Sequence, residues 1–178
     1  MPDNWVQTDV LGRYGYAMVI DKNRAELAKR SIDAAFSGLV PPPDDRLLHP
    51  KCMDDGDIAD FYGRPNIAVL PDAFLIRNYA APSFFTAEAF RYYMPAFMRW
   101  SVEHPGSIEY VVESSLRAFD PGPAGDPLRD FQLSKFRLFD DAQRDAVVLF
   151  LQTFEQVPDL GRVAAAALAH YWRRPDGG

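Results

Sequence analysis

The sequence predicts a mostly α-helical protein: a single-domain bundle of about five helices, with a long loop rich in proline and aspartate and at most a minor short β element. Three observations support this prediction. Apolar residues recur at helical spacing in five stretches, the length of 178 residues suits one hydrophobic core, and no internal repeat or linker-like composition divides the chain. We therefore expect one α-helical domain over residues 1–178, with an irregular segment at 1–21 and a flexible tail at 174–178.

The first helix is predicted over residues 22–39. Asp21 is a suitable N-cap, and Gly38 followed by three prolines at 41–43 ends the helix, because proline cannot continue it. Apolar positions recur every three or four residues along this stretch: Ala25, Ala28, Ile32, Ala35, Phe36 and Leu39. Before the helix, the short apolar run at 16–20 could form a strand.

Residues 40–66 make up the long connection that is rich in proline and aspartate. The next segment, residues 71–80, can be read as a short helix that opens at Pro71 or as a strand. The path of residues 40–80 therefore stays open at this point.

An aromatic-rich helix is predicted at residues 83–100, and it is the most distinctive part of the chain. Thr86 is a good N-cap, which leaves Phe85 just outside the helix to pack on Phe90 as a hydrophobic staple. At about 100° per residue, the apolar side chains fall on one face: Phe90, Tyr93, Met94, Phe97, Met98 and Trp100. We interpret most of these rings as core.

The opposite face of this helix carries Glu88, Tyr92, Pro95 and Arg99. Pro95 has no N–H to offer the carbonyl of Arg91, so we expect it to kink the helix around the core, with that carbonyl toward solvent. Tyr92 projects with Glu88 and Arg99 from this polar side. It is therefore the aromatic side chain that we expect to be most available to a partner.

The next helix is predicted after Ser107, which serves as its cap. Glu113 and Arg117 form an i,i+4 pair on its solvent face, and the opposite side forms a buried stripe: Ile108, Val111, Val112, Ser115, Leu116 and Phe119. Residues 120–127 are rich in proline, glycine and aspartate, which predicts a flexible loop with turns. Residues 131–139 partly alternate in polarity and could be extended.

Two more helices follow. Asp140 with Gln143 three residues later resembles a capping box, and it opens a helix that runs to residue 154. This helix is apolar on nearly all sides, so we expect it in the middle of the core. After Pro158, a final helix is predicted over residues 159–172.

Composition and charge exclude several classes of protein. The formal net charge is -6 and the pI is about 5.0, whereas nucleic acids and anionic membranes are bound by clustered Lys and Arg. The single cysteine, Cys52, can form neither an internal disulfide nor a cysteine-rich zinc site. No apolar run approaches the roughly 20 residues of a membrane span, and the start lacks a signal-peptide pattern. We therefore expect a cytoplasmic, bacterial-type protein.

Carboxylates gather in the long connection, next to His49 and Cys52: Asp44, Asp45, Asp54, Asp55, Asp57 and Asp60. Such a cluster could hold a hard divalent cation. An EF-hand register, however, would place Lys51, Met53 and Tyr62 at ligand positions, and no His-x-x-x-His or cysteine pair supports zinc. We expect no metal and no cofactor. The cluster fits a solvated acidic loop, or an acidic surface for a basic partner.

No catalytic motif is recognisable. The three histidines His49, His104 and His170 stand apart in the sequence, and a nucleophile elbow, a phosphate loop and a dinucleotide-binding motif are all missing. A catalytic site assembled in space from scattered residues is left open. We assign no catalytic residue.

The segment at 90–98, FRYYMPAFM, resembles the F-x-Y-Y-[LM]-P-A helix of an uncharacterised bacterial family, a domain of unknown function. Three further pieces are similar in the expected order: 32–36, 60–63, and 139–143 leading into 146–151. The resemblance covers roughly residues 30–155, and it leaves the first 21 residues and the C-terminal helix outside. It implies a small α-helical protein and no particular activity.

Two classes of function are consistent with the sequence. The first is a non-catalytic protein-interaction role, most concretely an immunity-type protein that neutralises a basic bacterial toxin by electrostatic steering and steric plugging. Its candidate contact residues are Asp54, Asp55, Asp57, Asp60, Glu88, Tyr92 and Arg99. The alternative is a small enzyme or ligand-binding protein whose pocket is assembled from scattered polar residues, such as Tyr92, Arg99 and His49. A structural or oligomeric role is a third class, and the oligomeric state is left open.

Overall fold

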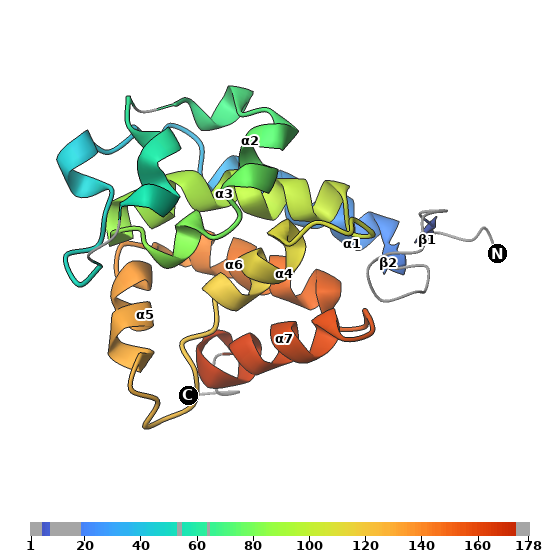
Figure 1. The fold of residues 1–178 in the computed structure, drawn as a ribbon. Helices are drawn as coiled ribbons and strands as arrows, with labels where there is room; N and C mark the ends of the chain where they lie inside the picture. Colours follow the sequence, from blue (N-terminus) through green and yellow to red (C-terminus); the bar gives the residue numbers. More distant parts are fainter. Residues whose placement is uncertain (1–4, 8–18, 53–54, 64, 174–178) are drawn as a thin grey trace.

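Most of the chain is helical in the computed structural model, which describes residues 5–7, 19–52, 55–63 and 65–173 (Figure 1). The α-helices of these residues are α1 (Lys22–Ala35), α2 (Asp72–Arg77), α3 (Ala87–Glu103), α4 (Val111–Ala118), α5 (Arg129–Phe136), α6 (Asp141–Phe154) and α7 (Leu160–Ala167), and a π-helical turn, Leu168–Trp172, continues α7. Short 3-10 helices are η1 (Asp44–Arg46), η2 (Gly56–Phe61), η3 (Ile67–Val69) and η4 (Ala81–Ser83). Two strands, β1 (Trp5–Gln7) and β2 (Val19–Asp21), pair antiparallel with Trp5 opposite Asp21.

The mostly α-helical class predicted from the sequence is confirmed. The strand expected at 16–20 overlaps β2, although residues 16–18 lie outside the described residues. The segment expected to be irregular, 1–21, contains both strands, and its residues 1–4 and 8–18 lie outside the described part, as does the tail at 174–178.

Three helices begin where their capping residues predict. The Asp21 carboxylate accepts the N–H of Arg24 at 2.8 Å and starts α1. The Thr86 hydroxyl accepts the N–H of Ala89 at 3.1 Å and starts α3. A full capping box starts α6, because the side chains of Asp140 and Gln143 each accept a backbone N–H from the other residue. These bonds satisfy donors that the first turn of a helix leaves without partners.

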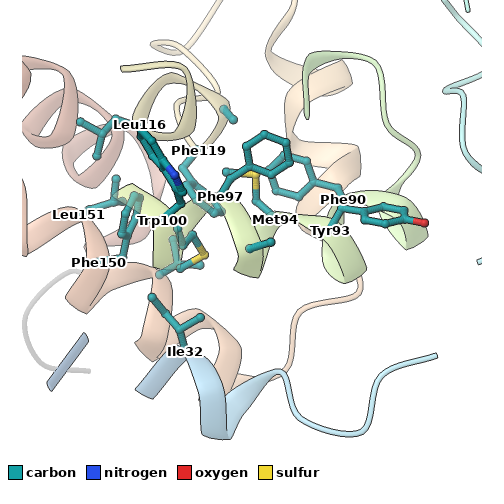
Figure 2. Packing of buried hydrophobic residues seen from close by; sticks show 14 of the residues in the cluster. Ile32, Phe90, Tyr93, Met94, Phe97, Trp100, Leu116, Phe119, Phe150 and Leu151 are labelled. Carbon is teal, nitrogen blue, oxygen red and sulfur yellow. The ribbon is translucent and has the colours of Figure 1, made fainter. Parts of the chain in front are cut away.

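Helix α3 lies in the middle of the fold, with α1, α4, α5 and α6 packed against it (Figure 1). Buried side chains from α1, α4 and α6 meet the apolar residues of α3, as Ile32, Leu116 and Leu151 illustrate (Figure 2). One cluster of buried residues extends from Ile20 to Trp172. Helix α3 is therefore the most enclosed element, and the expectation that α6 would occupy the middle is wrong: Asp141 and Asp145 keep one side of α6 exposed.

The long connection at residues 40–66 is fixed to the core. Leu47, Ile58 and Phe61 are fully buried, and the Phe61 ring packs edge-on against Phe85 and Tyr93, at centroid distances of 4.9 and 4.8 Å. Edge-to-face aromatic pairs of this kind stabilise a core beyond the area they bury. Three apolar anchors thus hold a segment whose composition suggests a loop.

Residues 71–80 adopt the helical alternative, since α2 begins directly after Pro71. Residues 131–139, whose partial alternation suggested that they could be extended, instead lie largely in α5, which ends at Phe136. The helical spacing explains the difference: Lys135 lies one turn after Phe131, with its Nζ 4.5 Å from the centre of that ring, and Phe136 beside it is fully buried. The alternation of polarity in this stretch is therefore coincidental.

Two further expectations are corrected. Ile108 is 55% exposed rather than buried, because the helix begins only at Val111 and residues 107–110 form a turn in which Ser107 Oγ accepts the N–H of Glu109. Pro95, which its spacing places on the polar side of α3 away from the apolar stripe, is itself buried. Across the residues that the structure describes, no helix has both the length and the apolar character needed to cross a membrane.

Candidate functional site

The predicted acidic residues lie on and beside η2. Asp55, Asp57 and Asp60 are exposed, whereas Ile58 and Phe61 of the same short helix are fully buried. Because side chains three residues apart lie above one another in a 3-10 helix, Asp57 and Asp60 share the outer side. We call Asp55, Asp57 and Asp60 the acidic surface. Asp54, the fourth predicted member, lies outside the described residues.

Asp60 has fixed partners. Its Oδ2 accepts hydrogen bonds from Asn78 Nδ2 at 2.9 Å and from Arg77 Nε at 2.8 Å. The hydrogen bond from Asn78, followed by the hydrogen bond and charge of Arg77, lowers the pKa of Asp60 below its ordinary value. The acidic surface is therefore ionised at neutral pH at this position, and it is tied to the C-terminal end of α2.

The other carboxylates of the connection have different partners. Asp55 accepts a long hydrogen bond of 3.5 Å from the Tyr62 hydroxyl, and Asp44 accepts the N–H of Gly63 at 3.2 Å, which closes the segment on itself. Within the described residues, no group of three or more His, Cys, Asp or Glu side chains is placed to hold a metal ion. The chemistry available here is that of a negatively charged surface.

Glu88, Tyr92 and Arg99 lie along one side of α3, as predicted, but Tyr92 is not available as an exposed contact. It is only 5% exposed, with its ring packed edge-on against Tyr93 at 4.8 Å. Glu88 is paired with Arg46 at 3.3 Å, and Arg99 is paired with Asp33 at 3.2 Å. The expectation for Tyr92 is wrong because segments distant in sequence cover this side of the helix.

Those covering segments leave two small hollows along α3. One, of about 330 Å³, is lined by Tyr92, Pro95 and Arg99, together with residues 36–39 and 66–68. The other, of about 150 Å³, lies between Glu88 and Tyr92. Tyr92 lines both hollows.

A third and larger hollow, of about 420 Å³, lies where α3 begins, and the sequence did not predict it. Its lining includes Arg46, His49, Glu88, Ser134 and Arg137. These residues come from the long connection, from the first turn of α3 and from the end of α5. Ser134 and Arg137 belong to the stretch that the sequence suggested was extended, so no pattern pointed to this grouping.

The hydrogen bonds around His49 indicate which of its ring nitrogens carries the proton. The backbone N–H of Lys51 donates to His49 Nδ1 at 3.2 Å, so the ring proton is assigned to Nε2, which faces Ser134 Oγ at 3.3 Å. Ser134 in turn donates its hydroxyl to the carbonyl of Phe131 at 2.6 Å. Burial, together with the positive charge of Lys135, lowers the pKa of His49. The imidazole is therefore a neutral donor to the serine, which is the reverse of what a general base for a serine nucleophile requires.

The remaining histidines have separate partners. His104 caps the C-terminal end of α3, where its Nδ1 lies 3.0 Å from the carbonyl of Trp100. His170 Nδ1 lies 2.7 Å from Asp120 Oδ1, which ties the π-helical turn to the loop after α4. Both positions are typical of histidines that stabilise a helix end.

The described residues thus define a mostly helical protein with an acidic surface on η2 and a row of hollows along the polar side of α3. The chain matches, over residues 52–175, a family described as "Family of unknown function (DUF6714)". It belongs to that family. The resemblance inferred from the aromatic-rich helix is confirmed at this level, and the match also covers the C-terminal helix, which lies outside the residues that carry the resemblance. No curated protein and no solved structure matches the chain.

Proposed function

We propose that the protein is a non-catalytic binding protein that docks onto a basic protein through its acidic surface. The observation that carries this proposal is the way Asp55, Asp57 and Asp60 stand exposed on a segment whose apolar residues, Ile58 and Phe61, are fully buried. A fixed cluster of negative charge steers a positively charged partner during association and orients it on contact.

The most concrete form of this role is an immunity-type protein that occupies the basic active site of a bacterial toxin. Such sites bind anionic substrates, so an acidic protein surface can take their place. In this proposal the protein acts in the cytoplasm as a single helical domain, an organisation supported by the continuous buried cluster from Ile20 to Trp172. Glu88 and Arg99 would lie at the edge of the contact.

The proposal is tested with the double variant Asp55→Lys/Asp57→Lys. These exposed side chains do not pack in the core, so the variant should fold normally. Wild-type protein should retain a partner from the native host and should protect cells against a toxin encoded by a neighbouring gene, whereas the double variant should lose both properties. Asp130→Lys/Asp145→Lys, at exposed positions of α5 and α6, changes the net charge by the same amount; it is the charge-matched control and should behave as wild type. If wild type has no stable partner and gives no protection, the proposal fails.

A second candidate function is the binding of a small ligand along α3. It is favoured by the hollow of about 330 Å³ whose lining includes Tyr92 and Arg99 together with apolar Pro95, because ligand sites are apolar cavities with a few placed polar groups. A thermal-shift screen of small carboxylates should find compounds that stabilise wild type but not Arg99→Ala. Arg30→Ala, on the exposed side of α1, is the control. A screen without such compounds would remove this candidate.

A further inference from the structure

Two exposed tyrosines stack on each other at the surface. The rings of Tyr79 and Tyr110 have centroids 5.2 Å apart and an interplanar angle of 27°, and the two residues are 37% and 52% exposed. Ile108, close to Tyr110 in the same turn, is 55% exposed. Single exposed apolar residues are ordinary on a protein surface, but a contiguous group of large ones is typical of an interaction site. We call Tyr79 and Tyr110 the tyrosine stack.

The tyrosine stack is fixed to the fold from both sides. Tyr79 follows Asn78, a buried residue whose side-chain amide donates to the Phe74 carbonyl and to Asp60, at 2.9 Å in each case. Tyr110 is the N-cap residue of α4. Tyr79 therefore follows directly on a residue that is hydrogen-bonded to Asp60 of the acidic surface.

The chemistry of this surface selects a cation with a flat face. An aromatic ring attracts a cation placed over its face, and a guanidinium group stacks there more readily than an ammonium group does. Asp60 accepts a hydrogen bond from Asn78, the residue before Tyr79, and Glu109 is the residue before Tyr110 in the chain. Arg77 also adjoins Asn78, but its charge is already paired with Asp60 at 2.8 Å. Tyrosine is also a residue that commonly dominates the binding energy of protein interfaces.

We propose that the tyrosine stack is the docking site for an arginine side chain of the basic partner. The guanidinium lies over the outer face of a tyrosine ring, and its remaining N–H groups are directed to the neighbouring carboxylates. This inference rests on the proposed function, and it names the side chain that the partner must present. The acidic surface attracts the partner, and the tyrosine stack holds it.

The inference is tested by fluorescence anisotropy with fluorescein-labelled octa-arginine and octa-lysine at low ionic strength. Tyr79→Ala and Tyr110→Ala should each weaken octa-arginine binding about three- to tenfold and should weaken octa-lysine binding less, because ammonium groups gain less from stacking. Tyr79→Phe and Tyr110→Phe keep the rings and should bind as wild type. Leu128→Ala removes an apolar side chain that is also largely exposed, at 61%, and serves as the matched control.

The Asp55→Lys/Asp57→Lys variant separates the two proposals in the same assay. It should weaken both peptides and reduce the salt dependence of binding. If the tyrosine-to-alanine variants bind octa-arginine as wild type does while the charge variant is weakened, the tyrosine stack is not the arginine site and the acidic surface stands. If the charge variant also binds as wild type does, or if wild type binds neither peptide, both proposals are overturned.

Discussion

Lys135 donates a hydrogen bond from its Nζ to the carbonyl oxygen of Ser83 at 2.7 Å, and this contact joins α5 to the turn that precedes α3. The side chain is fully buried. A second bond of 3.3 Å goes to the Pro82 carbonyl, and the Phe131 ring lies 4.5 Å from Nζ. Carbonyls and a ring supply partial charge but no full negative charge, so burial lowers the pKa of Lys135 to about 7.

This lowered pKa predicts a pH dependence of stability. Between about pH 7 and the ordinary lysine value of 10.5, the unfolded chain carries a proton on Lys135 that the folded chain does not. The free energy of unfolding should therefore rise with pH across this window, by up to about 1.4 kcal/mol per pH unit from this group, and the contribution should be constant below it. Urea unfolding of wild type and Lys135→Met across the window measures the effect. Equal slopes for the two proteins would contradict the prediction.

The two buried tryptophans Trp100 and Trp172 should respond differently to replacement by phenylalanine. Trp172 Nε1 donates to the Phe119 carbonyl at 2.7 Å, whereas Trp100 Nε1 has no hydrogen-bond partner among the described residues. Both side chains are 4% exposed, so both variants lose a similar volume. Trp172→Phe also leaves a carbonyl without its donor, and it should cost about 1–3 kcal/mol more than Trp100→Phe. Urea unfolding gives the comparison, and equal losses would show that the hydrogen bond contributes nothing.

Gly161 should not tolerate alanine. It lies in the first turn of α7, where the backbone of the preceding helix end comes so close that an added Cβ would overlap the carbonyl oxygen of Glu155. Gly161→Ala should therefore destabilise the protein by about 1–3 kcal/mol or more, as overpacking does. Gly38→Ala is the control: its φ of 73° is strained for alanine, but its surroundings are open, so its cost should be limited to about 1–2 kcal/mol. Thermal unfolding of both variants tests the order.

The capping box of α6 should have a measurable effect of its own. Asp140→Ala removes the carboxylate that accepts the Gln143 N–H at 2.9 Å, and it should lower the free energy of unfolding by about 1 kcal/mol. Asp140→Asn retains an accepting oxygen and should recover most of that loss. Chemical denaturation measures the free energy of unfolding of the two variants. If both lose a similar amount, the stabilisation comes from the charge of Asp140 and not from its hydrogen bond.

Local signals predicted the helices well because caps and spacing act over a few residues. Asp21, Thr86 and Asp140 start helices as expected, and Glu88 and Arg99 lie on the side of α3 that their spacing predicts. Tyr92 was misjudged because a helix considered alone does not reveal that residues 36–39 and 66–68 cover its polar side. His49 and Ser134 are 85 residues apart, so only the folded chain brings them together. The tyrosine stack is invisible in the sequence for the same reason.

Three hydrogen bonds to backbone carbonyls fix the start of the long connection against the beginning of α3. Thr86 donates its N–H to the Leu47 carbonyl at 2.9 Å and its hydroxyl to the Arg46 carbonyl, while His49 donates its N–H to the Phe84 carbonyl at 2.8 Å. With Ile58 and Phe61 buried further along, the backbone of η2 is held in place before any partner arrives. Binding of the proposed partner would therefore cost little conformational entropy in this segment. More of the free energy of each contact would then contribute to the affinity.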